Sequence, residues 1–148
     1  MEAKILFLID TVTVRNEAIE YSLELAKRID SSIILLLLLE YGTDELAEME
    51  RKHPEDIEAY IKSEIIHYMK KISTGGIVVE AEMRIGDPSS ELLKFLAETK
   101  SIETIIWGGK TDLCNEKESN KKLHWLLKIR KSMKCPVVFP VKDNKLAV

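Results

Sequence analysis

Hydrophobic residues gather in five short runs along the chain, and longer stretches with a helical spacing of apolar positions separate them. The runs at 3–9 and 33–39 are almost entirely apolar, which is typical of strands buried on both faces of a parallel sheet. The run at 77–83 alternates in part between apolar and charged residues, which indicates an edge strand with one exposed face. The fourth and fifth predicted strands are 104–107 and 137–141.

Four helices are predicted between these strands. Apolar residues at spacings of three and four place the first helix at 15–29 and the second after Pro54, ending near residue 74. Asp87 and Pro88 begin the third, because aspartate caps free N–H groups and proline suits the first helical position. The fourth carries Leu123, Leu126, Leu127 and Arg130. The stretches 40–53 and 108–120 are predicted to be irregular loops.

The strict alternation of strands and helices predicts one α/β domain that spans residues 1–148. We expect a five-stranded parallel sheet, with strand order 3-2-1-4-5 and helices on both faces. Pro140 has no N–H for a sheet ladder, so the fifth strand is predicted to lie at an edge of the sheet or to end at this residue.

Charge and composition narrow the range of partners. A net charge of −3 argues against a nucleic-acid-binding surface, since such domains are usually clearly basic. The longest apolar run has seven residues, whereas a membrane-spanning helix needs about 20, so no membrane segment is expected. The two cysteines, Cys114 and Cys135, show no paired spacing, which favours a reducing, cytoplasmic location.

A ligand in such a sheet would bind beyond the carboxyl ends of strands one and four, where the strand order reverses. Asp10 and Thr11 follow the first strand, and the segment Gly108-Gly109-Lys110-Thr111 follows the fourth. Asp10 could contact a ribose, a nucleobase or a metal, or it could cap the next turn. The two glycines could let backbone N–H groups approach an anion, with Lys110 adding charge and Thr111 a hydroxyl, or they could form a generic turn.

Other kinds of site are poorly supported. A true P-loop would need glycine where Thr104 stands inside a strand. The histidines, His53, His67 and His124, have no partners at metal-ligand spacing, and His67 and His124 are predicted on helix faces. Cys114 lies in a polar stretch with no histidine tied to it, so it is expected to be an ordinary thiol.

Five segments in the right order resemble the universal stress protein family: residues 4–10, 20–28, 86–88, 105–108 and 135–138. The resemblance implies a Rossmann-like fold related to that of the adenine nucleotide alpha hydrolases. It also implies a homodimer built through the last strand, which here contains Val137, Val138, Phe139 and Val141.

The resemblance also implies one of two subclasses, because the family contains proteins that bind ATP and proteins that do not. Binders carry glycine, two residues, glycine, nine residues, and then glycine with serine or threonine. Gly108 matches the first position, but Thr111 takes the second and Lys121-Lys122 take the final pair. By the same resemblance, Asp10 matches the adenosine-contacting aspartate, Leu38 the residue behind the base, and Gly109 a position that is often serine.

Three functions follow from these observations. The leading hypothesis is a cytoplasmic stress-response or regulatory protein, dimeric and without robust ATP binding. The alternative is an adenine-nucleotide-binding protein, taking ATP with Mg²⁺ or AMP, in which residues 108–111 form a variant phosphate loop with the lysines at 121 and 122 replacing backbone donors. A weak ATP hydrolase would further need a base and a metal site, for which Asp10 and Asp112 are the candidates.

Overall fold

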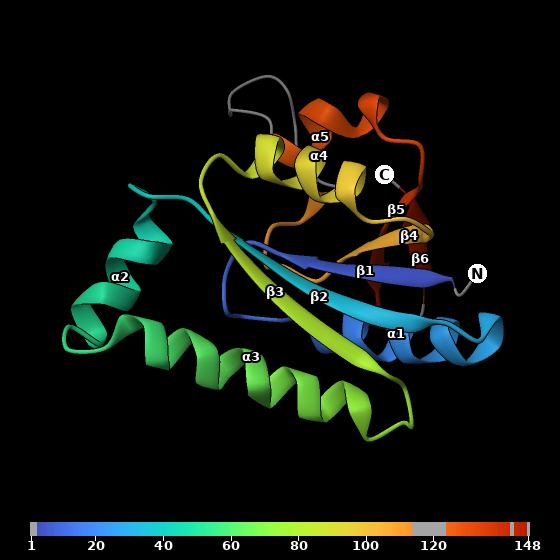
Figure 1. Cartoon of the computed structure of the whole chain (residues 1–148), viewed down its shortest axis with the longest axis horizontal. Coiled ribbons are helices and arrows are strands. Elements are labelled where there is room, and N and C mark those ends of the chain that lie inside the picture. The colour runs from blue at the N-terminus through green and yellow to red at the C-terminus, as the bar shows by residue number, and fades with distance from the viewer. Residues whose placement is uncertain (1–2, 114–123, 143, 148) are drawn as a thin grey trace.

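A single mixed sheet forms the centre of the molecule in the computed structural model, which describes residues 3–113, 124–142 and 144–147 (Figure 1). The strand order is β3-β2-β1-β4-β5-β6. The first five strands are parallel and confirm the predicted order 3-2-1-4-5. The strands are β1 (Lys4–Ile9), β2 (Ser32–Leu39), β3 (Val79–Ile85), β4 (Ile102–Trp107), β5 (Val137–Val141) and β6 (Asn144–Ala147).

Helices cover both faces of the sheet. In Figure 1, α1 and α3 lie on one face, and α4 and α5 lie on the other. The α-helices are α1 (Asn16–Ile29), α2 (Asp44–Lys52), α3 (Ile57–Ser73), α4 (Pro88–Glu98) and α5 (Trp125–Ile129), and the short 3₁₀ helix η2 (Arg130–Ser132) continues α5. None of the helices in these described ranges is long and apolar enough to span a bilayer.

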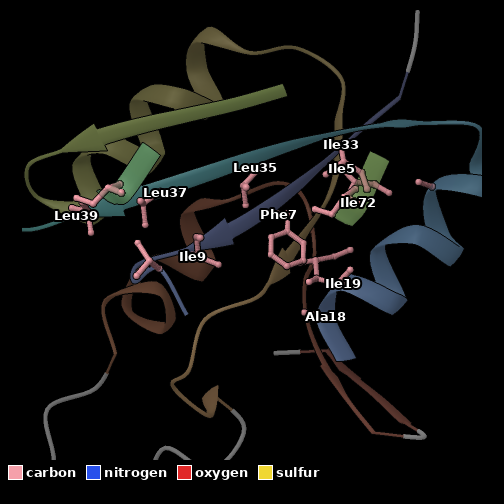
Figure 2. Close-up of a cluster of buried hydrophobic side chains, with 14 of the residues drawn as sticks. Ile5, Phe7, Ile9, Ala18, Ile19, Ile33, Leu35, Leu37, Leu39 and Ile72 are labelled. Atoms are coloured by element: carbon pink, nitrogen blue, oxygen red, sulfur yellow. The ribbon is translucent and has the colours of Figure 1, made fainter. Parts of the chain in front are cut away.

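Strands β1 and β2 are buried on both faces, as their apolar runs predict. Because side chains alternate along a strand, Ile33 and Leu35 face α1 and α3, whereas Ile34 and Leu36 face α4 and α5. Figure 2 shows the first of these two cores, in which Phe7 lies among residues from β2, α1 and α3. At the edge of the sheet, β3 exposes Glu80 and Glu82, which confirms its predicted edge position.

Capping residues explain where several helices begin. The Asp87 side chain accepts a hydrogen bond from the Ser90 N–H and Pro88 is the first residue of α4, as predicted. Pro54 lies outside α3, however. Asp56 is the N-cap instead, and its carboxylate accepts a hydrogen bond from the Ala59 N–H at 3.0 Å. A side-chain acceptor at this position satisfies an otherwise unpaired N–H group, which fixes the helix start.

Part of the loop predicted at 40–53 is in fact the helix α2. Its N-cap is Thr43, whose hydroxyl accepts from the Leu46 N–H at 3.3 Å. Leu46 and Met49 are buried and join the core on the α1 and α3 face. The helix has only these two buried positions among charged residues, so its apolar pattern is too sparse to predict it.

The antiparallel strand β6 was not predicted, and it corrects the expectation that β5 lies at an edge. Four residues of β5, from Val138 to Val141, pair with the four residues of β6. The ladder between β5 and β4 covers Val137 and Val138. Pro140 therefore stops the ladder with β4, but β5 itself continues on the other side, against β6.

Candidate functional site

The loops after β1 and β4 meet at the carboxyl ends of the strands, as the strand order predicts. The Gly108 N–H donates to the Leu8 carbonyl at 2.9 Å, and the Gly108 carbonyl accepts from the Arg15 N–H at 3.0 Å. Six of the seven candidate residues lie in these two loops: Asp10, Thr11, Gly108, Gly109, Lys110 and Thr111. Leu38 does not join them: it is 1% exposed and packs in the core on the α4 and α5 face.

Asp10 is engaged by two side chains from the start of α5. Its Oδ2 lies 3.2 Å from Nε2 of His124 and accepts from Nε1 of Trp125 at 3.3 Å. Nδ1 of His124 accepts from the Leu126 N–H at 3.1 Å, so the imidazole proton must be on Nε2, which donates to Asp10. The histidine is therefore an N-cap tied to Asp10, and not the helix-face residue that the sequence predicted.

A cluster of three aromatic rings, those of Trp107, His124 and Trp125, packs beside the loop that follows β4. Trp107 is fully buried, and its indole N–H donates to the Thr111 carbonyl at 2.9 Å. Its ring meets the rings of His124 and Trp125 edge-on, with centroids 5.0 and 6.2 Å apart. This geometry is favourable for aromatic pairs. The loop backbone and the Asp10 partners are thus fixed to the same buried ring.

The two glycines of this loop are required for packing. A Cβ at Gly108 would lie 2.3 Å from the Phe7 ring, and one at Gly109 would lie 2.6 Å from the Trp107 indole. Both distances are far shorter than the 3.5–4.0 Å of ordinary carbon contacts. Glycine at both positions lets the backbone lie directly on the protein's own aromatic residues, a role distinct from the approach to an anion that the sequence suggested.

Arg15, at the N-cap position of α1, ties the ends of β4 and β5 together. Its guanidinium donates to the carbonyls of Gly109 at 2.8 Å, Pro140 at 2.6 Å and Trp107 at 2.6 Å. The same group lies 4.0 Å from the centroid of the Phe139 ring. Its donors replace the ladder that Pro140 interrupts. Sequence reasoning missed Arg15 because its partners lie more than ninety positions away in the chain.

A small hollow opens beside the loops, next to α2. Its volume is about 200 Å³, below the range of roughly 300–1,000 Å³ that is usual for small-molecule sites. Thr11 and Lys110 line it together with Thr13. The Thr11 hydroxyl accepts from the Thr13 N–H at 3.2 Å and so stabilises the turn. The other lining residues are Val12, Glu45, Glu48, Met49, Lys52, His53 and Tyr60.

Charges in this hollow are mixed. Glu48 forms ion pairs with Arg51 and Lys52, and the His53 ring stacks on Tyr60 at 3.7 Å between centroids. Within the described parts of the chain, no three His, Cys, Asp or Glu side chains come together as a metal site would require. Cys114 lies outside the described residues, and burial raises the pKa of the half-buried Cys135 thiol.

Comparison with known proteins identifies the family. The model of the universal stress protein family matches residues 1–111, which is well over half of the chain. The chain belongs to the universal stress protein family. No curated protein sequence matches it significantly.

Several solved universal stress proteins share the fold. The protein UspA from Lactobacillus plantarum is 14% identical, with a TM-score of 0.66 over 94% of this chain and 97% of that chain. A family member from Archaeoglobus fulgidus is 13% identical, with a TM-score of 0.58 over 95% of both chains. A member from Arabidopsis thaliana, solved with AMP bound, is 17% identical, with a TM-score of 0.53 over 93% of this chain and 90% of that chain. At these identities the likeness concerns the fold.

Two positions of the family's ATP motif can be placed in this universal stress protein. Gly108 lies against Phe7. Thr111 stands in the place of the second glycine, and its carbonyl accepts a hydrogen bond from the Trp107 indole. The final pair of the motif, Lys121-Lys122, lies outside the described residues. In the described half of the motif, both Gly108 and the Thr111 carbonyl therefore make contacts inside the protein.

Proposed function

We propose that this chain is a cytoplasmic stress-response or regulatory universal stress protein that acts without robust ATP binding. Family membership supports the stress-response role. The free thiol of Cys135 fits a reducing compartment such as the cytoplasm. The absence of robust ATP binding is supported by the contacts at the carboxyl ends of β1 and β4, where a nucleotide would lie.

The observation that carries it is the engagement of Asp10. A carboxylate that contacts adenosine must offer at least one oxygen to the ligand. Here Oδ2 already accepts from Nε2 of His124 and Nε1 of Trp125. A ligand at this oxygen would have to displace both donors, and their half-buried polar atoms would then need new partners. Part of the binding energy would be lost to this exchange.

Thermal unfolding with Mg-ATP tests the proposal. A ligand present at a hundred times its Kd stabilises a protein by about 2.7 kcal/mol, which for a domain of this size raises Tm by roughly 5–10 °C. We expect no such shift at millimolar Mg-ATP, and no nucleotide released when the purified protein is denatured. A shift of that size would refute the proposal.

A second candidate function is adenine-nucleotide binding through a variant phosphate loop. Lys110 and Thr11 line one hollow beside the loops, and the Arabidopsis thaliana relative was solved with AMP bound. A monophosphate would be the easier ligand, because the hollow is small and Lys110 is the exposed cation of the loop. This candidate predicts stabilisation by AMP that is at least as large as stabilisation by ATP.

Lys110→Met separates the two candidates. If a nucleotide binds at this loop, its stabilisation should fall sharply in Lys110→Met and persist in Lys70→Met, a matched change of an exposed lysine on α3. Gly108→Val is unsuitable for this purpose, because its side chain would collide with Phe7 and destabilise the fold whatever the ligand. Equal AMP shifts in both lysine variants would exclude the variant phosphate loop.

A further inference from the structure

The outer edge of β5 is closed by the chain itself. Residues 138 to 141 pair antiparallel with residues 147 to 144, in the order Val138↔Ala147 to Val141↔Asn144. Positions 142 and 143 alone separate the two strands. By contrast, the register between β5 and β4 covers two residue pairs. Strand β6 thus supplies much of the pairing that β5 makes in the sheet.

The direction of the β5 backbone groups shows what β6 covers. The Pro136 carbonyl accepts from the Ile105 N–H, and the Pro140 carbonyl accepts from Arg15, both on the β4 side. Neighbouring residues of a strand direct their N–H and C=O groups to opposite edges. The backbone groups of Val138 therefore also face β4, whereas those of Phe139 and Val141 face outward. The backbone groups of both prolines therefore face β4. Every residue of β5 whose backbone groups face outward has an N–H that can donate a hydrogen bond.

Such an edge is a template for another strand. A second copy of this chain is the occupant that the geometry favours, because a two-fold axis at a sheet edge brings the same strand of the partner alongside in the antiparallel direction. Strand β6 runs antiparallel to β5 as well. The chain's own β6 and the β5 strand of a second copy would therefore use the same N–H and C=O groups of Phe139 and Val141.

We propose that β6 is a built-in competitor of dimer formation through β5. With β6 in place the chain is monomeric, and release of β6 opens β5 to the β5 strand of a second copy. The homodimer through Val137, Val138, Phe139 and Val141 stays a prediction, and this inference makes it conditional on β6. It is independent of whether the protein binds a nucleotide.

Light scattering coupled to size exclusion tests this directly. The full chain should elute with a mass near 16.9 kDa at micromolar concentration. A chain that ends at Val141 should elute at about twice the mass of one copy, with the dimer fraction rising with concentration. A full-length variant, Leu146→Pro, should behave in the same way, because proline in place of Leu146 removes the N–H that faces Phe139. Leu146→Val keeps that N–H and should remain monomeric.

A disulfide lock gives the complementary experiment. Val138 and Ala147 lie directly opposite each other, and antiparallel partners have Cα atoms about 4.5–5.5 Å apart, which suits a disulfide. In a Cys114→Ser, Cys135→Ser background, Val138→Cys with Ala147→Cys should form an intrachain bond, and the oxidised protein should stay monomeric at every concentration.

Several results would overturn the proposal. One is a full-length dimer in which the engineered disulfide is intrachain, since β6 would then not compete with assembly. Another is a shortened chain and a Leu146→Pro variant that are folded by circular dichroism yet monomeric. Loss of folding in both variants would also refute it, because β6 would then be an indispensable part of the sheet and not a releasable competitor.

Discussion

Replacing Arg15 by alanine should destabilise the protein more than any other single change of an arginine in the described chain. The guanidinium donates three hydrogen bonds, to the carbonyls of Trp107, Gly109 and Pro140, at 2.6–2.8 Å. It also lies over the Phe139 ring. Arg15→Ala would leave three backbone carbonyls at the ends of β4 and β5 without their donor.

The size of the effect can be worked from these contacts. Hydrogen bonds to a charged group contribute about 1.5–3 kcal/mol each, and a cation–π contact about 0.5–2 kcal/mol, which together give roughly 5–11 kcal/mol. Two effects reduce this figure. The Arg15 side chain is 16% exposed, so water can reach some of the carbonyls, and the alanine variant avoids about 2 kcal/mol of side-chain entropy loss. Since single substitutions rarely exceed 4–5 kcal/mol, we expect a loss of about 3 kcal/mol.

Urea unfolding followed by circular dichroism measures this loss. In thermal unfolding, about 3 kcal/mol corresponds to a fall in Tm of roughly 6–12 °C for a domain of this length. Arg15→Lys should recover only part of the loss, because an ammonium group cannot donate to three carbonyls in the planar arrangement of a guanidinium. The m-value should not change, since the surface exposed on unfolding stays the same.

Arg51→Ala is the matched control. Arg51 is 71% exposed on α2 and pairs with Glu48, and exposed ion pairs of this kind contribute at most about 1 kcal/mol. If Arg15→Ala lowers the free energy of unfolding no more than Arg51→Ala does, then Arg15 does not link β4 to β5 and the reasoning about Pro140 is wrong.

Three further predictions concern other parts of the molecule. Gly108→Ala should lower Tm clearly, since its Cβ would lie 2.3 Å from the Phe7 ring, and forced overpacking costs about 1–3 kcal/mol; an unchanged Tm would show that the loop can move away. Asp87→Ala should cost about 1 kcal/mol through loss of the α4 cap. The Ser90 N–H bond lowers the pKa of Asp87, so this contribution is present above the unfolded-state pKa and is lost as the pH falls; urea midpoints measured from neutral pH downward should converge for the two proteins, and a constant difference would contradict the assignment. In a Cys114→Ser background, Cys135 should react with a thiol reagent much more slowly than a free cysteine at mildly alkaline pH, since burial raises its pKa; equal rates would show that it is accessible.

The parts of the fold that could be predicted from the sequence are those that local pattern determines. The runs in β1 and β2 have no polar face, so they fit only the centre of a sheet covered on both sides. The alternation of strands and helices then restricts the order of the strands. Asp87 could be identified as a cap because its carboxylate and the N–H group that donates to it, that of Ser90, are only three residues apart in the sequence.

The parts that could not be predicted depend on partners distant in the chain. Strand β6 has four residues, and its pairing with β5 is what makes it a strand. His124 gave a helix-face signal, whereas its role depends on Asp10, more than a hundred positions earlier. The signal that could have identified α2 is Thr43 followed by Asp44 and Glu45, a cap and two acidic residues at a helix N-terminus.

The glycine after β4 shows why a partial motif is weak evidence of a ligand. In a phosphate loop, glycine is needed so that backbone N–H groups can approach an anion. At Gly108 the same requirement arises from the Phe7 ring, which occupies the space of a Cβ. A protein of this fold that had lost its nucleotide would therefore still need the first glycine, and would be free to lose the second. Glycine at 108 with threonine at 111 is the combination that such a protein would keep. Because the Phe7 ring alone already requires glycine at 108, the presence of this glycine is by itself no evidence of a ligand.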